Sequence, residues 1–354
     1  MRFGRSEKSR LRLTDHFHWY SPGLDLNDLG YLRQADSISN QLFLGWSETE
    51  PKGIFRTYSV QYAREDHWDF DGLKIRSANS LEASAQFKNK WRAESNFQLE
   101  QSVDTRALRG GPALRFHDVW STEFAARSDS SRRASFSIAG EHAISLDDDS
   151  RLSRIEGLAS FRPSNRFTFS GRTSYERHAN HLQYATTAAT SDGPRWLLGR
   201  IEQDTWSFTL RANLVLTPDL TIQYYGSPFI SAGRYSAFKR AAETLAEVFG
   251  DRFHLFSPGE ISFRSDSNSY IVSERPDATS YSFANPDFSF RQFRSNLVLR
   301  WEYRPGSTLY AVWAQGRTAS EPRWNTAFSS NWSALWRERP DNVFLVKLTY
   351  WFSP

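Results

Sequence analysis

Apolar and polar residues alternate along many short stretches of this chain. Near the C-terminus one face would carry Phe344, Val346, Leu348, Tyr350 and Phe352, and the other Leu345, Lys347, Thr349 and Trp351. The same alternation recurs in residues 81–87, 91–100, 167–176, 205–216 and 293–303. A period of two predicts β-strands, because successive side chains of a strand point to opposite faces. The pattern therefore predicts an all-β fold.

Turn signals separate these stretches. The short ones are residues 51–53, 88–90, 162–165, 191–194, 217–219 and 304–307, and most contain Pro or Gly. Longer connections lie at residues 21–34, 104–113, 231–287 and 318–340. Alternating short and long connections are typical of outer-membrane barrels, which have periplasmic turns and extracellular loops. Counting back from a periplasmic C-terminus gives roughly 16 strands with both termini in the periplasm.

One segment departs from the strand pattern. Between Ala237 and Phe249, the residues Phe238, Ala242, Leu245 and Phe249 share one helical face. Gly250 follows as a helix stop. We therefore expect one short helix in the longest extracellular loop, as a packing element; the alternative is a gate or a partner-docking helix.

Composition bears on which face of the strands meets water. The chain has 354 residues, of which 15% are aromatic, and its mean hydropathy is −0.61 without an apolar stretch long enough for a membrane-spanning helix. Barrel strands average out in hydropathy, and excess aromatic residues fit interfacial girdles. We predict a single transmembrane antiparallel up-and-down β-barrel over residues 1–354. The alternative is a soluble all-β module that binds or hydrolyses carbohydrate, with its polar face in water.

Charge and cysteine content narrow the function classes. The chain has no cysteine, so it has neither disulfides nor thiolate metal sites. Its net charge is only +4, and no basic tract interleaved with aromatic residues indicates nucleic acid. No apolar signal-peptide core follows Met1. We interpret the chain as the C-terminal part of a longer protein of the bacterial outer membrane.

Three stretches carry a resemblance to a known family. They are Ser21–Tyr31, Leu216–Leu220 with Tyr225–Tyr235, and Pro286–Phe288 with Asn296–Leu309. Together they resemble the C-terminal barrel region known as domain of unknown function 5916. The resemblance implies an outer-membrane barrel, often preceded by a module similar to family 9 carbohydrate-binding modules, which this chain lacks. It supplies no catalytic residues.

The polar faces of the predicted strands provide candidate lumen residues. These would be Arg92, Glu94, Arg172, Glu176, Arg211, Arg294, Arg300 and Glu302. An arginine facing lipid near the midplane costs roughly 2–4 kcal/mol, which favours the lumen for the arginines. The glutamates lie on the same faces beside them. Neighbouring carboxylates such as Glu100 can perform acid–base catalysis, but a charge-balanced barrel lining explains them more simply.

Other candidates lie in predicted loops. Asn27, Asp28, Trp324, Trp332 and Trp336 are placed to contact a ligand, for example by stacking on sugar rings, although packing explains the same residues. The histidine pairs 16/18 and 178/181 and the acidic run 147–149 could contribute to metal sites, but surface roles explain them as well. We expect no metal and no cofactor.

No serine-nucleophile elbow, phosphate-binding loop or zinc-protease motif is present, so catalysis is not expected. The sequence favours a porin-like barrel that passes or captures polar solutes or glycans, with outer-membrane lipid as its other partner.

Overall fold

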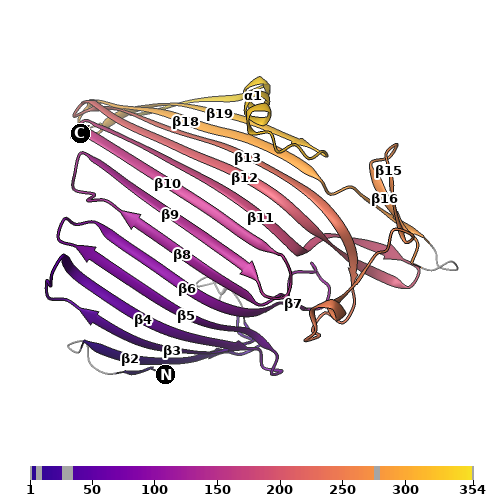
Figure 1. The fold of residues 1–354 in the computed structure, drawn as a ribbon. Helices are drawn as coiled ribbons and strands as arrows, with labels where there is room; N and C mark the ends of the chain where they lie inside the picture. The colour runs from indigo at the N-terminus through magenta and orange to yellow at the C-terminus, as the bar shows by residue number, and fades with distance from the viewer. Residues whose placement is uncertain (1, 5–9, 26–34, 275–279, 353–354) are drawn as a thin grey trace.

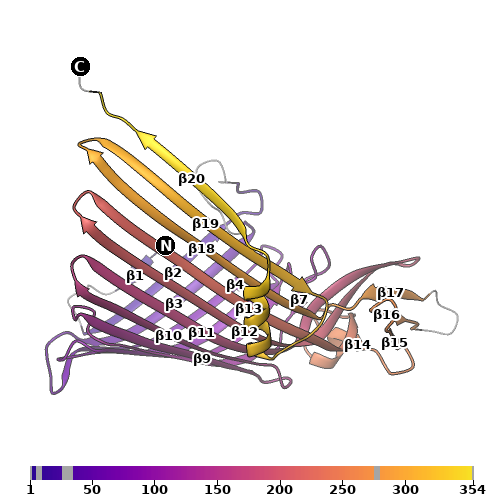
Figure 2. The same cartoon turned by 90° about the horizontal axis from the view of Figure 1, so that it is seen from above.

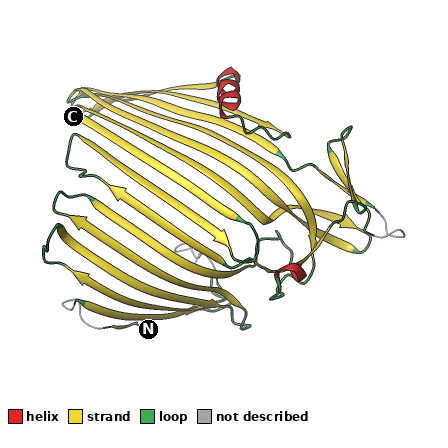
Figure 3. Cartoon of the chain, in the orientation of Figure 1, coloured by secondary structure: helices red, strands yellow, loops and turns green. Residues whose placement is uncertain are grey.

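The computed structural model describes residues 2–4, 10–25, 35–274 and 280–352 (Figure 1). Strands dominate this part of the chain, as Figure 3 shows by colour. They are β1 (Arg2–Gly4), β2 (Leu11–Tyr20), β3 (Ser37–Glu48), β4 (Phe55–Trp68), β5 (Lys74–Phe87), β6 (Arg92–Asp104), β7 (Leu114–Arg115), β8 (Val119–Arg127), β9 (Ala134–Ser145), β10 (Arg151–Ser164), β11 (Phe167–Thr190), β12 (Gly193–Thr217), β13 (Leu220–Ala241), β14 (Phe253–Leu255), β15 (Ile261–Arg264), β16 (Ser269–Val272), β17 (Tyr281–Ala284), β18 (Phe288–Arg304), β19 (Ser307–Glu321) and β20 (Asp341–Thr349). The helices are the 3-10 turn η1 (Phe249–Arg252) and α1 (Phe328–Arg337). The all-β prediction is confirmed.

Seventeen strands form one large antiparallel sheet, and β15, β16 and β17 form a small separate one. Nearly every strand of the large sheet pairs with its neighbour in sequence. The exceptions are β6 with β8 and β13 with β18. The longest connections, between β2 and β3, β6 and β8, β13 and β18, and β19 and β20, lie at one end of the sheet, which we call the loop end; the opposite end is the turn end (Figure 1). The two-residue turn between β11 and β12 also lies at the loop end.

The register divides the sheet into two faces, because residues opposite each other in antiparallel strands point to the same side. One row across β5, β6, β8, β9, β10 and β11 is Glu82, Asn96, Glu123, Glu141, Arg154 and Glu176. The adjacent row on the other side is Ala83, Ser95, Phe124, Gly140, Ile155 and Tyr175. We call these the polar face and the apolar face.

The apolar face is exposed in this structure. Phe344 retains 73% of its accessible surface, Phe136 56%, Ile155 49% and Leu81 47%. All four lie on the apolar face by the pairings of their strands. The large sheet therefore buries little of its apolar surface within the chain itself.

A second region is packed in the ordinary way. Strands β11, β12 and β13 have 24, 25 and 22 residues and run beyond their neighbours at the loop end (Figure 1). Two clusters of buried apolar residues form there, one around Leu197 and Phe238 and one around Leu108 and Leu198. We call this region the cap; it comprises residues 105–118, 146–150, 180–200 and 235–274 together with 280–287. The rest of the large sheet, including the remaining parts of β11, β12 and β13, forms the wall.

The wall is not closed in the part of the chain that the structure describes. The last strand, β20, pairs only with β19, and β1 pairs only with β2. Figure 2 shows β20 as the outermost strand along one border of the sheet. What the structure shows is thus a large antiparallel sheet, whereas the sequence predicts a closed barrel.

The predicted helix at Ala237–Phe249 is wrong. Residues as far as Ala241 continue β13, where Arg240 pairs with both Leu197 and His254. Phe238 lies in the cap core, so strand pairing and burial outweigh the local helical spacing. The α-helix lies instead between β19 and β20, where Phe328, Trp332, Leu335 and Trp336 share one face.

Candidate functional site

All eight predicted lumen residues lie on the polar face. Arg92 and Glu94 are on β6, Arg172 and Glu176 on β11, Arg211 on β12, and Arg294, Arg300 and Glu302 on β18. The register places Arg172 opposite Thr209 and Arg294 opposite Ser227. The pairings therefore bring these residues to one face of the sheet; that this face lines a lumen stays a prediction.

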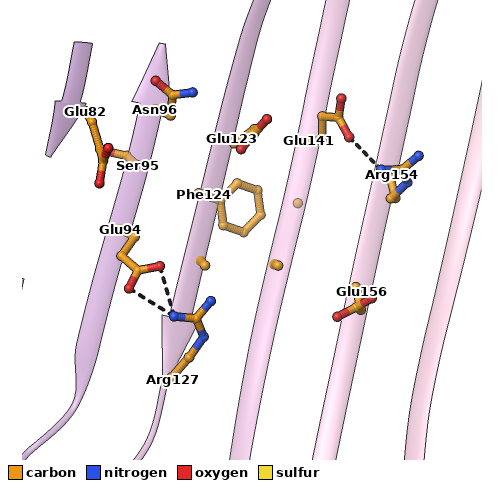
Figure 4. A pocket seen from close by; sticks show the side chains of 13 residues that line it. Glu82, Glu94, Ser95, Asn96, Glu123, Phe124, Arg127, Glu141, Arg154 and Glu156 are labelled. Atoms are coloured by element: carbon orange, nitrogen blue, oxygen red, sulfur yellow. Dashed lines mark hydrogen bonds and ion pairs between the residues drawn. The ribbon is translucent and has the colours of Figure 1, made fainter. Parts of the chain in front are cut away.

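The polar face is hollowed between β5 and β10. The hollow has a volume of about 540 Å³. Its charged residues are Glu82, Glu94, Glu123, Arg127, Glu141, Arg154 and Glu156. These side chains come from β5, β6, β8, β9 and β10, and Figure 4 shows how they lie. Carboxylates outnumber guanidinium groups in this hollow, so it favours positive charge.

Most of these carboxylates are engaged by arginines on neighbouring strands. Arg127 donates to both oxygens of Glu94 at 2.9 Å. Arg154 lies between Glu141, at 2.9 Å, and Glu176, which it also contacts. Figure 4 marks the first and second of these pairings. Such cross-strand bridges hold the strands in register on the polar face.

The same arrangement continues on the flanking strands. Arg172 donates to Glu156 at 2.7 Å. On the other flank, Arg76 donates to Glu100 at 2.9 Å and contacts Glu65. Two carboxylates of the hollow lack such a partner. Within the described residues, neither a hydrogen bond nor an ion pair reaches the side chains of Glu82 and Glu123.

Charge is divided unevenly around the polar face. We call the polar face of β4 to β11 the acidic sector; its carboxylates are Glu65, Glu82, Glu94, Glu100, Glu123, Glu141, Glu156 and Glu176, and its arginines are Arg76, Arg92, Arg127, Arg154 and Arg172. We call the polar face of β12 to β20 the basic sector; its charged residues are four basic ones, Arg211, Arg294, Arg300 and Lys347, and two acidic ones, Glu302 and Asp341. The two sectors carry opposite net charge.

Two of the predicted loop tryptophans pack against the sheet. Trp332 lies 5.5 Å from Phe208, and Trp336 lies 4.8 Å from Phe293, between ring centroids. Both partners belong to the apolar face of β12 and β18. Helix α1 therefore lies on the apolar face of the sheet near its loop end, and these two rings make that contact.

Helix α1 also covers arginines of the apolar face. Arg291 is 3% exposed and donates to Asn331 on the helix at 3.1 Å. It also contacts Glu321 and lies 3.5 Å from Glu338. Arg317 donates to the carbonyl oxygens of Trp336 and Glu338 at the end of the helix.

The third predicted tryptophan, Trp324, remains partly exposed at 37% and lies under the guanidinium of Arg234 at 4.4 Å. Asn27 and Asp28 lie outside the described residues. The loop candidates therefore do not form one common site in the described part of the chain.

The cap contains a cluster of charged groups at the tip between β9 and β10. Asp149 accepts two hydrogen bonds from Arg200, at 2.6 and 2.8 Å, and contacts His181. These bonds lower the pKa of Asp149. Asp148 is buried, with its Oδ2 atom 3.8 Å from the Nδ1 atom of His117. Burial lowers the pKa of His117.

A buried lysine lies close to this cluster. Lys239 is 1% exposed and donates to the carbonyl oxygen of His181 at 2.9 Å. Burial lowers the pKa of its amine to about 8. Arg252, also buried, donates to the carbonyls of Ala246, Glu247 and Phe116. These contacts fasten the cap segments to one another.

The predicted metal candidates do not assemble. His16 and His18 share the polar face of β2, as the alternation predicts, but His18 bonds Ser39 at 2.7 Å. His178 and His181 both lie inside β11 and not beside a loop. In the ranges that the structure describes, no group of three or more His, Asp and Glu is placed to hold a metal ion.

Sequence reasoning missed Glu82, Glu123, Arg127, Glu141 and Arg154. Each lies on the polar side of an alternating stretch, so alternation would have assigned their face. Which carboxylate meets which arginine depends on register between strands, and the sequence of one strand does not contain that information.

The architecture defines a class: an all-β protein built on one large antiparallel sheet with a charged face and an exposed apolar face. The chain belongs to the family of the domain of unknown function DUF5916, whose model matches residues 4–353.

A comparison with curated proteins finds no match. In the described part of the chain, no helix combines the length and hydropathy needed to cross a membrane.

Proposed function

We propose that this protein is a β-barrel of the bacterial outer membrane whose polar lumen passes polar solutes. The observation that carries the proposal is the exposed apolar face, which lies opposite a charged face along the whole wall. A soluble sheet covers its apolar face, and exposed apolar patches beyond a few hundred Å² mark surfaces that meet another apolar phase. Lipid is the partner that matches an uninterrupted apolar band around a sheet.

The distribution of residues along the strands supports lipid contact. On β4 the apolar face carries Val60 and Tyr62, and then Arg64 and Asp66 toward the loop end. At the turn end, Phe55 contacts Tyr58 and Phe87 at ring distances of 5.2 and 5.3 Å. An apolar band bounded by aromatic residues and then by charges is the arrangement of transmembrane barrels.

The two borders of the sheet support closure into a barrel. With β1, β7 and β14 left out of the 17-stranded sheet, fourteen strands remain, so β2 and β20 run antiparallel. An even number of antiparallel strands is typical of bacterial outer-membrane barrels. Unpaired strand edges cannot remain exposed in lipid. We therefore propose that β20 pairs with β2 and displaces the three-residue strand β1.

Membrane partition tests the proposal at its first step. The protein should fractionate with outer membranes and migrate faster on a gel before heating than after heating. A monodisperse, detergent-free monomer would contradict the proposal and favour the soluble all-β carbohydrate module.

The seam can be tested by cross-linking, because the chain has no native cysteine. Leu345→Cys on the polar face of β20 should form a disulfide with one of Arg12→Cys, Thr14→Cys or His16→Cys on the polar face of β2. Leu13→Cys points to the opposite face and is the matched control. Cross-linking to none of the three would reject the β2–β20 seam.

Capture of glycans at the cell surface is a narrower proposal, and it rests on Trp324. The ring is partly exposed beside Arg234, and such a pair can stack on a sugar and bond its hydroxyls. Trp324→Ala should abolish glycan binding and leave the folded yield unchanged. Trp336→Ala, which removes a packing contact, should instead lower the folded yield.

A further inference from the structure

We propose that the polar face discriminates between solutes by the separation of charge within them. The acidic sector attracts the positive end of a solute and the basic sector its negative end. The favoured solute is therefore a zwitterion, and singly charged ions of either sign are disfavoured. This inference rests on the proposed passage of solutes and names their chemical class.

The unpaired carboxylates of the acidic sector lie in one row. Glu82 and Glu123 lie on either side of Asn96 across three consecutive strands. Side chains directly opposite in adjacent antiparallel strands are about 5 Å apart, so both carboxylates border Asn96. Their neighbour Glu141 is engaged by Arg154 at 2.9 Å. Glu82 and Glu123 therefore contribute most of the unneutralised negative charge of the hollow.

The free charge of the basic sector lies on β12 and β18. Arg211 lies over the ring of Tyr225 at 5.4 Å, which leaves its positive charge unneutralised. Arg294 lies directly opposite Ser227, and no carboxylate bonds it in the described residues. By contrast, Arg300 is paired with Glu302 at 2.8 Å.

Screening by salt limits the electrostatic influence of each sector to short distances. Charges separated by more than about 8 Å are largely screened at physiological ionic strength. A small ion near one sector therefore senses mainly that sector. A simple anion is repelled by the acidic sector and a simple cation by the basic sector, whereas a zwitterion can orient to satisfy both.

Reporter cysteines measure the two local potentials without requiring conductance. Asn96→Cys lies between Glu82 and Glu123, and Ser227→Cys lies opposite Arg294. Each variant would react with a trimethylammonium and a sulfonate methanethiosulfonate reagent of similar size. We expect the ratio of cationic to anionic reaction rate to be at least about fivefold higher at Asn96→Cys than at Ser227→Cys. Equal ratios would overturn the proposal.

Charge removal supplies the matched controls. Glu82→Gln with Glu123→Gln should lower the ratio at Asn96→Cys by about threefold or more and leave Ser227→Cys unchanged. Arg294→Gln should raise the ratio at Ser227→Cys only. Changes of the same size at both reporters would show that the reaction rates depend on the net charge of the whole polar face and not on the charge of each sector. That result would reject the inference.

Liposome swelling then tests the solute class. We expect glycine to enter faster than glycolate or ethanolammonium, which have similar size and one charge. The Glu82→Gln, Glu123→Gln variant should lose this preference. Equal rates for the three solutes would reject the inference and leave passage intact. No swelling with any solute, with heat-modifiable protein present in the liposomes, would reject the proposed function and with it the cargo class.

Discussion

The wall and the cap contain similar apolar residues in opposite surroundings. In the cap, Leu108, Leu114, Leu197 and Leu198 have no accessible surface. In the wall, Leu44, Leu81 and Leu99 keep between 41% and 47% of theirs. Because the cap buries its apolar side chains within the chain, it can fold against water. The apolar side chains of the wall stay exposed, and this difference supports their contact with lipid.

The strongest test of this comparison is removal of a leucine from each region. Leu197→Ala should lower the free energy of unfolding by about 2–5 kcal/mol, because it leaves a cavity in the cap core. Leu81→Ala on the wall should have a smaller effect, because lipid can fill the space. Denaturant titration of the detergent-solubilised protein, followed by tryptophan fluorescence, would measure both changes. Equal losses would show that the two regions share one environment.

A charge placed on the wall tests the face that meets lipid. Val60→Arg points an arginine into the apolar band of β4, and Gln61→Arg places the same residue on the polar face. The first should destabilise the membrane-inserted form by about 2–4 kcal/mol, and the second by much less. The yield of heat-modifiable protein after refolding into lipid would report the difference. A reversed order would contradict the assignment of faces.

The contact between α1 and the wall provides a third test. Asn331 is 1% exposed and bonds both Arg291 and the backbone of Asn325. Asn331→Ala should lower the free energy of unfolding by about 1–3 kcal/mol, because the buried guanidinium of Arg291 loses a hydrogen-bond partner. Ser333→Ala, on the exposed side of the same helix, is the control. The stability difference between these two variants measures how far α1 protects the arginine; no difference would exclude that role.

These comparisons also show what the sequence could and could not reveal. Alternation is local, so it identified the strands and placed Arg92, Arg211 and Arg294 on one face. The alternation does not reveal whether the polar face points inward, as in a membrane barrel, or outward to water, as in a soluble sheet, because both arrangements have the same period. The ion pair of Arg154 with Glu141 joins different strands, so it requires their register.

The helix was missed for a different reason. Phe328, Trp332, Leu335 and Trp336 have helical spacing, so the sequence contained this signal. A similar spacing at Phe238 and Ala242 favoured the wrong segment. There the chain continues a strand, because pairing with β12 and β14 satisfies the backbone and buries Phe238. Both segments have helical spacing, and contacts with residues distant in sequence determine which of them forms the helix.

The smallest expected effect concerns pH and the cap alone. Lys239 has an amine with a pKa of about 8 in the folded cap, compared with 10.5 ordinarily. Between these values the unfolded chain binds more protons than the folded one, so stability rises with pH. From pH 7 to pH 9 the gain should be about 1 kcal/mol. Lys239→Met keeps the side-chain length and lacks the titrating group, so its stability relative to the native protein should fall by that amount over the same range.

The protease resistance of the cap, measured from pH 7 to pH 9, would report the stability of both proteins, with Lys347→Met on the wall as the control. A constant difference between pH 7 and pH 9 would show that the burial of Lys239 does not couple the cap to pH.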